Sequence, residues 1–554
     1  MGQDRKHPPG LYVLFFTEMW ERFGFYLMVG IFFLYMTDKE TGGLGMSRAQ
    51  AADVFGSYMA LVYLTPFLGG LLADRYLGYR PTIMMGGLLM ALGYLGLALP
   101  GAGPSFWLSL LIIILGNGLF KPNISTLLGN LYSDERYKAH KDAGYNIFYM
   151  GINIGAFICN FVAAYLRNHY TWGYAFAAGG IGMFIGLTIF LIGQGQVKAG
   201  DIRKPLRPED MPLVNIVALV FAPAAVFGVI GWFVPTMALG HPFIGSQSTD
   251  AFLFACVPVV AFYFSLWWRA SHEDRRSIGA LLAIFGVVVV FWAIFNQAGT
   301  ALTTWAENYT DRNLPAALAP AARTLGMVEE VDGKLKERPK LDAQFREEKD
   351  AAGNVIKAEE PNTYLLNLPK NEWPPEDGKL QLISTEIFQS INPFWVVVMT
   401  PVVVGFFNFL KKRGAEPSTP AKIAYGLTIS ALSALVMVGA VNATRNGLDK
   451  GSAAWLVGAY LVITLGELCL SPMGLSLVSK VSPPRLTALM MGGWFLSTSI
   501  GGKLSGTLAS MWDGYDNKAN FFLANMGLTL VAAVALFLMV PWLRGVVKEK
   551  TGAD

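Results

Sequence analysis

Long apolar runs recur along the whole chain and constrain its fold more than any other feature. A helix needs about 20 mostly apolar residues to cross a bilayer. Only 15% of the 554 residues are charged and 53% are apolar, whereas soluble domains carry about 25% charged residues. The sequence therefore predicts an all-α polytopic membrane protein with about fourteen spanning helices. The spans are expected near 11–37, 49–73, 81–99, 105–131, 143–166, 172–194, 212–236, 251–270, 277–305, 386–410, 422–442, 452–479, 485–511 and 520–543.

Basic residues gather at the N-terminus, in every second loop and at the C-terminus. An even number of spans places both termini on one side, and the positive-inside rule makes that side the cytoplasm. The charge is spread over short loops rather than one basic stripe, so we expect the lipid bilayer and no nucleic acid as a partner. The first apolar run is too long and too charged for a cleavable signal peptide. The residues that set this topology are Arg5, Lys6, Arg75, Arg80, Arg136, Lys138, Lys141, Lys198, Arg203, Lys204, Arg207, Arg269, Arg275, Arg276, Lys411, Lys412, Arg413, Lys422, Arg544, Lys548 and Lys550.

One long polar segment, residues 307–385, interrupts the pattern and falls on the outer side. It is rich in Glu, Lys, Asp and Pro, with short apolar pieces. A small extracytoplasmic subdomain and a partly disordered loop are both compatible with this composition. Its charges are expected to form a solvated surface, and we assign it no chemistry.

The first span carries three ionisable residues in an otherwise apolar run. Glu18, Glu21, Arg22 and Phe25 follow i, i+3, i+4, i+7 spacing and so share one helix face. A charge at bilayer depth costs about 2.5–3.5 kcal/mol, so this face must meet protein or water. Two carboxylates and one guanidinium leave a surplus negative charge that invites a proton or a cation. A buried structural ion pair is the alternative interpretation.

Two further ionisable residues lie deep in later spans. Lys121 is about sixteen residues into its span, too deep to reach an interface, and the helix-one carboxylates are its natural counter-ions. Glu467 is about fifteen residues into a span of the second half. An acidic wall and a basic wall in one cavity would suit a zwitterion with separated ends. The three cysteines lie inside apolar runs without metal-ligand spacing, so no metal site is expected.

Polar residues in the remaining spans are open to more than one interpretation. Gly151 and Gly155 form a GxxxG face for close helix contact. Asn153 beside them is equally consistent with interhelical bonding and with ligand contact. Trp494, considered alone, favours a lipid-facing or core position. Gly501-Gly502 indicates helix packing.

Taken together, these stretches resemble the proton-dependent oligopeptide transporter family, also called the peptide transporter family, within the major facilitator superfamily. Each piece is weak alone, but the set covers both halves of the chain in the right order. The matching stretches are Glu18-x-x-Glu21-Arg22-Phe23, Ala73-Asp74-Arg75, Phe120-Lys121-Pro122-Asn123, Phe148-Tyr149-Met150-Gly151-Ile152-Asn153-Ile154-Gly155, Phe388-Gln389-Ser390-Ile391-Asn392-Pro393 and Gly466-Glu467-Leu468-Cys469-Leu470-Ser471-Pro472.

The resemblance implies two six-helix bundles, residues 1–195 and 277–554, joined by a linker, residues 196–276, that carries an extra transmembrane hairpin. It implies symport of di- and tripeptides with protons by alternating access, in a bacterial inner membrane, with no cofactor beyond the proton and as a monomer. Proton coupling would fall to Glu18, Glu21, Arg22 and Lys121. The peptide would be bound by Tyr26, Tyr63, Lys121, Asn153, Asn392, Glu467, Ser471 and Trp494.

The chain departs from the family at two positions. Many bacterial members carry an arginine where this chain has Val29, and an acidic residue where it has Asn296. The family pairs these charges as an outer latch. Losing both together is coherent, because losing one alone would leave a buried charge unpaired. Coupling is therefore expected to depend more on the helix-one carboxylates and Lys121.

Two other function classes were weighed. The same fold could carry nitrate, an amino acid or a peptide-like metabolite, although Glu467 would repel a plain anion. An enzyme is not expected, because the sequence has no paired histidines, no nucleophile with a base and no phosphate-binding glycine loop.

Overall fold

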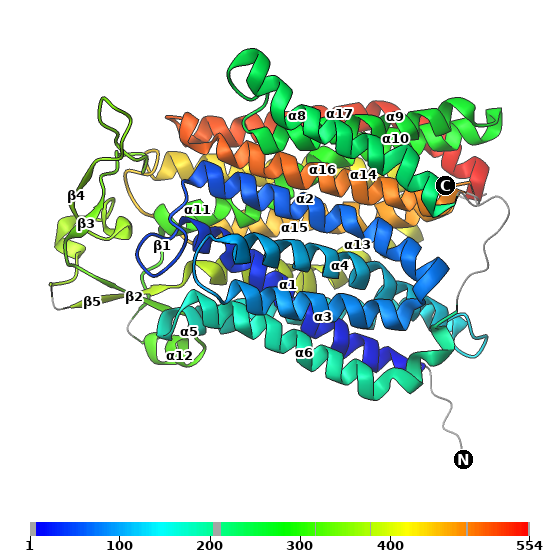
Figure 1. Ribbon diagram of the computed structural model, residues 1–554, viewed down its shortest axis with the longest axis horizontal. Coiled ribbons are helices and arrows are strands. Elements are labelled where there is room, and N and C mark those ends of the chain that lie inside the picture. The colour runs from blue at the N-terminus through cyan, green and yellow to red at the C-terminus, as the bar shows by residue number, and fades with distance from the viewer. Residues whose placement is uncertain (1–6, 203–211, 316, 377, 484–485, 552–554) are drawn as a thin grey trace.

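The computed structural model describes residues 7–202, 212–315, 317–376, 378–483 and 486–551. Long helices run side by side along one axis, and a small subdomain with short strands lies at one end (Figure 1). Helix α1 begins, and helix α17 ends, at the opposite end of the bundle. The predicted cytoplasmic residues Arg5, Lys6, Arg203, Lys204 and Arg207 lie outside the described residues.

Among the first six long helices, α1 is inserted between α5 and α6, and α3 packs against α4. Helix α2 begins with a capping box, in which the Ser47 side chain and Gln50 each bond the other's backbone N–H. It ends in a π-helical turn, Ala73–Leu77, before Gly78, whose φ of 82° reverses the chain. The six helices are α1 Gly10–Thr37, α2 Arg48–Leu72, α3 Tyr79–Leu97, α4 Pro104–Leu131, α5 Lys141–His169 and α6 Trp172–Val197.

An inserted hairpin follows. Short helix α7, Leu213–Ile216, and a π-helical segment, η4 Val217–Phe221, lead into helix α8, Ala222–Leu239. Helix α9, Gln247–Arg269, returns across the bilayer. Only 6% of its most apolar window is buried inside the protein, so α9 faces lipid over most of its length.

The second set of six helices contains two departures from regular α-helix. The expected span 277–305 divides at a 3-10 turn, η5 Asn296–Gly299, into α10 and the short α11. The expected span 386–410 begins as a 3-10 segment, η8 Thr385–Ser390. The elements are α10 His272–Phe295, α11 Ala301–Asn308, α13 Ile391–Lys412, α14 Thr419–Ala443, α15 Ala454–Val481, α16 Thr487–Ser510 and α17 Lys518–Thr551.

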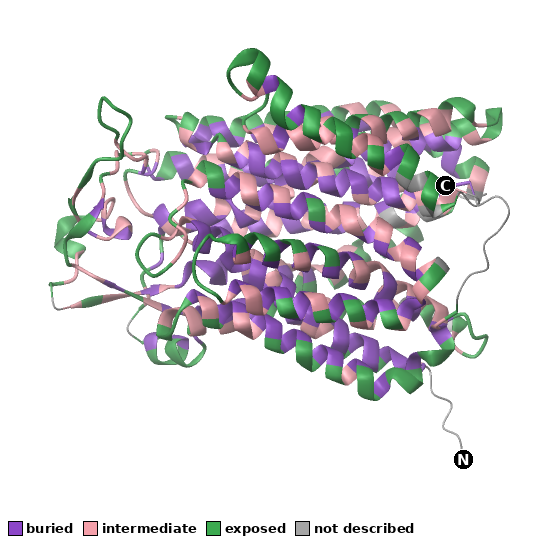
Figure 2. Cartoon of the chain, viewed as in Figure 1, coloured by how far each residue is buried: buried purple, intermediate pink, exposed green. Residues whose placement is uncertain are grey.

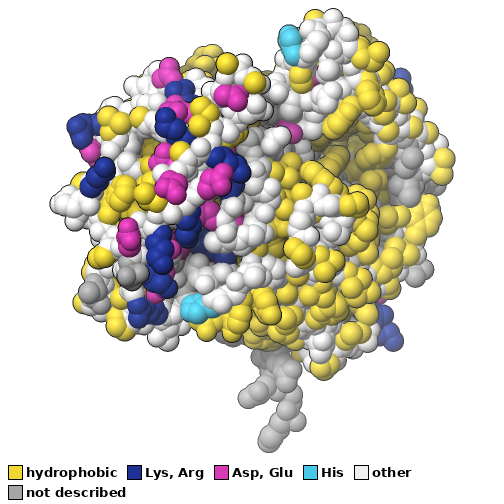
Figure 3. Space-filling view, turned by 60° about the vertical axis from the view of Figure 1, so that its left-hand side comes forward, with side chains coloured by type: hydrophobic (Ala, Val, Ile, Leu, Met, Phe, Trp, Pro, Cys, Tyr) yellow, Lys and Arg dark blue, Asp and Glu magenta, His cyan; other side chains and the backbone are white. Residues whose placement is uncertain are grey.

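Among the described residues, eleven helices are long and apolar enough by themselves to cross a membrane. Helices α1, α3 and α16 are not among them, because charged residues or many glycines lower their mean hydropathy. They still run parallel to the other long helices (Figure 1). Figure 3 shows charged side chains gathered at one end of the molecule and hydrophobic side chains covering the adjoining side of the bundle. This is the surface expected of a multi-span membrane protein.

The long polar segment forms a structured subdomain rather than a disordered loop. Two antiparallel pairs, β2 with β5 and β3 with β4, build it around a small core that contains Tyr364, Leu365 and Leu382. A short parallel pair, β1 with β6, ties it to the loop before α15. The remaining elements are β1 Thr310–Asp311, α12 Ala319–Thr324, β2 Val328–Asp332, β3 Lys336–Pro339, β4 Lys357–Glu360, η6 Thr363–Leu365, η7 Lys370–Glu372, β5 Lys379–Ile383, β6 Gly451–Ser452 and η10 Trp512–Gly514.

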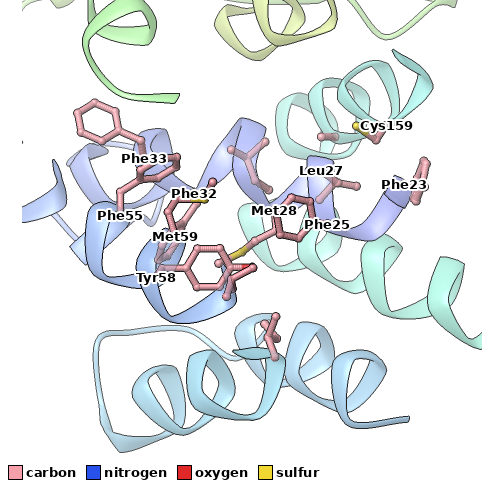
Figure 4. Close-up of a cluster of buried hydrophobic side chains, with 14 of the residues drawn as sticks. Phe23, Phe25, Leu27, Met28, Phe32, Phe33, Phe55, Tyr58, Met59 and Cys159 are labelled. Carbon is pink, nitrogen blue, oxygen red and sulfur yellow. The ribbon is translucent and has the colours of Figure 1, made fainter. Parts of the chain in front are cut away.

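The core follows the helix interfaces, where buried residues line the inner faces of both halves (Figure 2). Figure 4 shows aromatic side chains of α1 meeting those of α2, among them Phe32 against Phe55 and Tyr58. The GxxxG prediction for α5 is confirmed. A Cβ at Gly155 would lie 2.3 Å from the Met19 carbonyl oxygen of α1.

Candidate functional site

The charged face of α1 forms a compact buried cluster. Arg22 is 3% exposed and donates through Nε and Nη2 to the two carboxylate oxygens of Glu21, which is fully buried. Its Nη2 also reaches Asn117 Oδ1 of α4 at 3.4 Å. The bidentate pair satisfies both partners, as a charge pair inside a membrane requires. Glu21 and Arg22 therefore act as one neutral unit that joins α1 to α4.

Glu18 lies one turn earlier in α1 and is less completely hydrogen-bonded than Glu21. Its Oε1 lies 3.5 Å from Arg22 Nε, and the side chain is 5% exposed. Its Oε2 is buried without a hydrogen-bonding partner among the described residues. Arg22 is already committed to Glu21, so Glu18 is the carboxylate of the pair that has room to accept a proton. A protonated Glu18 could donate where the ionised form leaves an oxygen unsatisfied.

Lys121 faces the same region from α4, but it does not form the direct ion pair that the sequence predicted. Its Nζ lies 4.2 Å from the ring centre of Tyr63 and 5.9 Å from that of Phe25. Within the described part of the chain, no carboxylate lies within 4 Å of Nζ. Glu18 and Glu21 are close enough to interact with it electrostatically. In this conformation aromatic faces hold the ammonium and leave its hydrogen-bond donors open.

A central cavity lies between the two halves. From the first half it is lined by α1, α2 and α5, including Tyr26 and Tyr63. From the second half it is lined by α10, α13 and α15, including Asn392 and Glu467. The structure therefore brings together residues that are more than 400 positions apart in the chain. Four of the predicted peptide-binding residues share this cavity wall.

Glu467 is anchored by the neighbouring helix. Asn392 Nδ2 donates to Glu467 Oε2 at 3.2 Å and to Thr464 Oγ1 at 2.9 Å. Asn392 lies at the start of α13, directly after the 3-10 segment η8. The change from 3-10 to α-helix just before Pro393 places this amide on the cavity wall. Glu467 thus presents a carboxylate on the second-half wall, and the first-half wall is largely aromatic.

Four predicted peptide-binding residues do not line this cavity: Lys121, Asn153, Ser471 and Trp494. Lys121 lies against the rings of Phe25 and Tyr63, which do line it. Trp494 is 3% exposed and packs in the core of the second half, where its ring covers Gly474. Asn153 donates to the Tyr149 carbonyl of its own helix at 2.9 Å. Ser471 Oγ is buried without a hydrogen-bonding partner among the described residues. Their assignment to peptide binding stays a prediction.

Val29 and Asn296, the two departures from the family pattern, both line the cavity. Neither carries a charge. Asn296 is 8% exposed, and its Nδ2 has no hydrogen-bonding partner among the described residues. The cavity wall is therefore less charged here than the family pattern provides.

Polar residues that the sequence analysis did not select also reach the cavity. Asn160 of α5 donates to Ser390 Oγ at 3.0 Å, and its Oδ1 has no partner among the described residues. Gln389 donates to the Ala298 carbonyl at 2.6 Å and to Thr303 Oγ1 at 2.7 Å. Both are polar residues inside apolar runs, which is a reason to suspect a role. Sequence spacing does not show that both line the same cavity.

Polar contacts join the two halves outside the central cavity. Arg167 Nε at the end of α5 lies 3.1 Å from Glu386 of η8, which is fully buried. Ser499 of α16 donates to the Ala60 carbonyl of α2 at 2.6 Å. These contacts tie α5 to η8 and α2 to α16 in this conformation.

Comparisons with known proteins agree with this geometry. The sequence model of the POT family matches residues 80–325 and 377–542. The di-/tripeptide transporter of Lactococcus lactis subsp. lactis (strain IL1403) is 28% identical, covering 97% of this chain and 96% of that protein. The uncharacterized transporter YclF of Bacillus subtilis (strain 168) is 30% identical, covering 98% and 95% respectively.

Solved structures give the same result for the fold. A crystal structure of the peptide transporter POT in complex with sulfate superposes with a TM-score of 0.74 at 29% identity, covering 98% of this chain and 96% of that one. The two-bundle architecture with an inserted hairpin is therefore that of the major facilitator superfamily transporters. Because the family model spans most of the chain and both halves match in order, this protein belongs to the POT family.

Proposed function

We propose that this chain is a proton-coupled symporter that imports di- and tripeptides by alternating access. Relatives that match nearly its whole length are named di-/tripeptide transporters. The cavity between its halves carries an acidic group on one side and aromatic groups on the other, and Lys121 lies against one of those rings, Tyr63. A short peptide has a positive amino end and a negative carboxyl end, which this arrangement matches.

The observation that carries the proposal is the unequal bonding of the two α1 carboxylates. Glu21 is occupied by Arg22 through two hydrogen bonds, whereas Glu18 Oε2 is buried without a partner among the described residues. A proton on Glu18 would relieve this deficit. It would also change the net charge of the cluster that surrounds Lys121. Glu18 is therefore assigned as the proton acceptor, and the Glu21–Arg22 pair as its fixed support.

Peptide recognition is assigned to both halves. Glu467, oriented by Asn392, would bind the peptide amino group. Lys121 has unused donors and would bind the peptide carboxylate, with Tyr26 and Tyr63 beside it. When the peptide carboxylate neutralises Lys121, Glu18 loses a favourable neighbouring charge and gains affinity for a proton. Peptide and proton binding would thereby favour each other.

The driving force is sufficient for active uptake. A proton that moves inward gains about 2.3 kcal/mol per 100 mV of membrane potential. This energy corresponds to about 50-fold accumulation of peptide per proton. The proposal requires no cofactor other than the coupling proton. The protein is expected in a bacterial inner membrane, as a monomer with both termini in the cytoplasm.

Reconstitution in liposomes tests the proposal. A labelled dipeptide should accumulate when the outside is acidic and the inside negative, and accumulation should stop when a protonophore removes the gradient. Uptake that only equilibrates, with or without the gradient, would contradict proton coupling.

Other small solutes on the same fold are disfavoured by the geometry. A plain anion such as nitrate would meet the carboxylate of Glu467 in the cavity. Competition for labelled dipeptide separates the cargoes, since unlabelled dipeptide should inhibit uptake and excess nitrate should not. Inhibition by nitrate without inhibition by unlabelled dipeptide would overturn the peptide assignment.

A further inference from the structure

A second buried charge cluster lies away from the cavity, at the outer end of the interface between the halves. Lys503 of α16 is 1% exposed, and its Nζ lies 2.7 Å from Asp53 Oδ1 of α2. The same ammonium donates to Ser57 Oγ of α2 and to Ser248 Oγ of α9, each at 2.7 Å. Its three protons thus have three acceptors, one of which belongs to the inserted hairpin.

Asp53 receives most of its remaining hydrogen bonds from the first turn of α9. Ser246 Oγ donates to Oδ1 at 2.7 Å, and Ser248 Oγ donates to Oδ2 at 2.6 Å. Thr249 Oγ1 adds a longer bond of 3.3 Å. Ser246 is also the N-cap of α9, since its hydroxyl accepts from the Thr249 backbone N–H. The hairpin therefore surrounds the carboxylate with hydroxyl groups.

The backbones of α2 and α16 touch directly beside this cluster. A Cβ at Gly506 would lie 2.3 Å from the Ala52 carbonyl oxygen, and one at Gly56 would lie 2.9 Å from the Gly506 Cα. The ion pair and the glycine contact together fix the outer end of α2 against that of α16. Removing one partner would leave the other charge buried and unpaired, so this contact has two well-separated states, closed or broken.

We propose that Asp53 and Lys503 are positioning residues of the transport cycle that hold the outer side closed, and that the first turn of α9 is the third part of this latch. The proposal rests on alternating access, because an outward-open state requires the outer ends of α2 and α16 to separate. Ser248 Oγ bonds both Asp53 and Lys503, so the hairpin supports the closed state of the latch.

This assignment gives the inserted hairpin a role beyond that of a spacer between the halves. Loss of a hairpin hydroxyl weakens the latch without removing either charge. Loss of both charges removes the latch while leaving no unpaired ion. Neither kind of variant leaves an unpaired buried ion. Faster opening in both would therefore report on gating and not on destabilisation of the fold.

The test measures how often the outer side opens, using a cysteine in the cavity. Met59 of α2 is 4% exposed and lines the cavity, so Met59→Cys places the reporter behind the latch. Intact cells are treated from outside with a membrane-impermeant maleimide, and the labelling rate is compared among variants. Labelling requires opening of the outer side but no transported peptide.

The neutral pair Asp53→Asn with Lys503→Met should label about tenfold faster than the parent, because closure loses its charge pair. Ser248→Ala, which keeps both charges, should label about threefold faster, in proportion to one lost hydrogen bond. Exchange of the charges, Asp53→Lys with Lys503→Asp, should return the rate toward that of the parent.

Ser505→Ala is the matched control. Ser505 is fully buried on the same helix, but its hydroxyl donates only to the Gly502 carbonyl of α16 at 2.8 Å. This variant should label like the parent. A neutral pair and a Ser248→Ala variant that both label like the parent would overturn the latch. Failure of dipeptide uptake with these labelling changes intact would overturn the proposed cargo and leave the latch standing.

Discussion

Asn392 and Glu467 are joined by a 3.2 Å hydrogen bond between two helices of the second half, and this bond fixes the only acidic side chain found on the described wall of the central cavity. The amide of Asn392 also bonds Thr464, so its orientation is determined from two sides. The carboxylate is therefore prepositioned for a cationic group. Among the described lining residues, the first half contributes no acidic side chain. The cavity therefore carries negative charge on its second-half side only.

Replacing Glu467 should reduce affinity for the peptide amino end. We expect Glu467→Gln to raise the KM for a dipeptide about 10- to 100-fold, because a charge-assisted hydrogen bond contributes about 1.5–3 kcal/mol. An N-acetylated dipeptide, which has no amino charge, should be a poor substrate for the wild type, and the variant should discriminate less between the two. Equal KM values for the free dipeptide in both proteins would contradict this role.

Replacing Glu18 should separate exchange from accumulation. Glu18→Gln preserves size and supplies a donor, so it resembles the protonated state. Peptide exchange between equal concentrations should continue, whereas accumulation driven by a proton gradient should be lost. Both activities are measured in the same liposomes. Gradient-driven accumulation at the wild-type level would remove Glu18 as the proton acceptor.

Glu21→Gln provides the contrasting variant one turn away. It removes one charge of the bidentate pair and leaves Arg22 buried at 3% exposure. Breaking a buried pair from one side costs about 3–5 kcal/mol. The apparent Tm in detergent should therefore fall well below that of Glu18→Gln. Similar Tm values for the two variants would show that the carboxylates are equivalent.

Replacing Lys121 should abolish proton-driven uptake. The ammonium lies over Tyr63 with its hydrogen-bond donors open, and Lys121→Ala removes the proposed partner of the peptide carboxylate. A dipeptide amide, which lacks that carboxylate, should bind wild type weakly and should bind the variant about as well as the free peptide does. Binding is followed by thermal shift, so the result does not depend on transport. Undiminished uptake by Lys121→Ala would contradict the prediction.

The outer subdomain should show a pH-dependent stability that originates at Glu329. Burial acts to raise the pKa of this carboxyl, but Arg167 at 3.3 Å and Arg312 at 2.9 Å outweigh it and hold the pKa at about 2, below the ordinary 4.5. A lowered folded-state pKa stabilises the protein above pH 4.5, and this contribution is lost as the pH falls toward 2.

Glu329→Gln should therefore be less stable than the wild type at neutral pH by about 1–2 kcal/mol, discounted for partial exposure. The difference should shrink between pH 4.5 and pH 2, and unfolding followed at several pH values measures it. The control is Glu330→Gln in the same strand, whose partner Lys379 is 62% exposed. Its effect should stay within about 0.5 kcal/mol. A pH-independent difference for Glu329→Gln would contradict the assignment.

Much of the architecture followed from local pattern. Apolar length predicts spans, and helix spacing places Glu18, Glu21 and Arg22 on one face, because both properties depend only on a residue's own helix. The burial cost of a charge identified Lys121 and Glu467 as functional candidates without any contact being known. The GxxxG face of α5 was predictable for the same reason, since it needs only two small residues one turn apart.

Partners across helices could not be predicted in this way. Trp494 and Asn153 lie on helices that were correctly placed, yet one packs over Gly474 and the other bonds its own backbone. Asp53 and Lys503 are 450 positions apart, and nothing near either residue indicates the other.

The sequence alone determined that this chain is a membrane protein of many helices, which of its helices carry charge, and how deep those charges lie. The tertiary structure decided that Glu21 is occupied by Arg22 while Glu18 is not, that Lys121 rests on aromatic rings, and that the hairpin reaches Asp53. The physical reason is that burial cost is a property of one residue in its own helix. Hydrogen bonding instead depends on the rotation and separation of neighbouring helices, which only the packed bundle fixes.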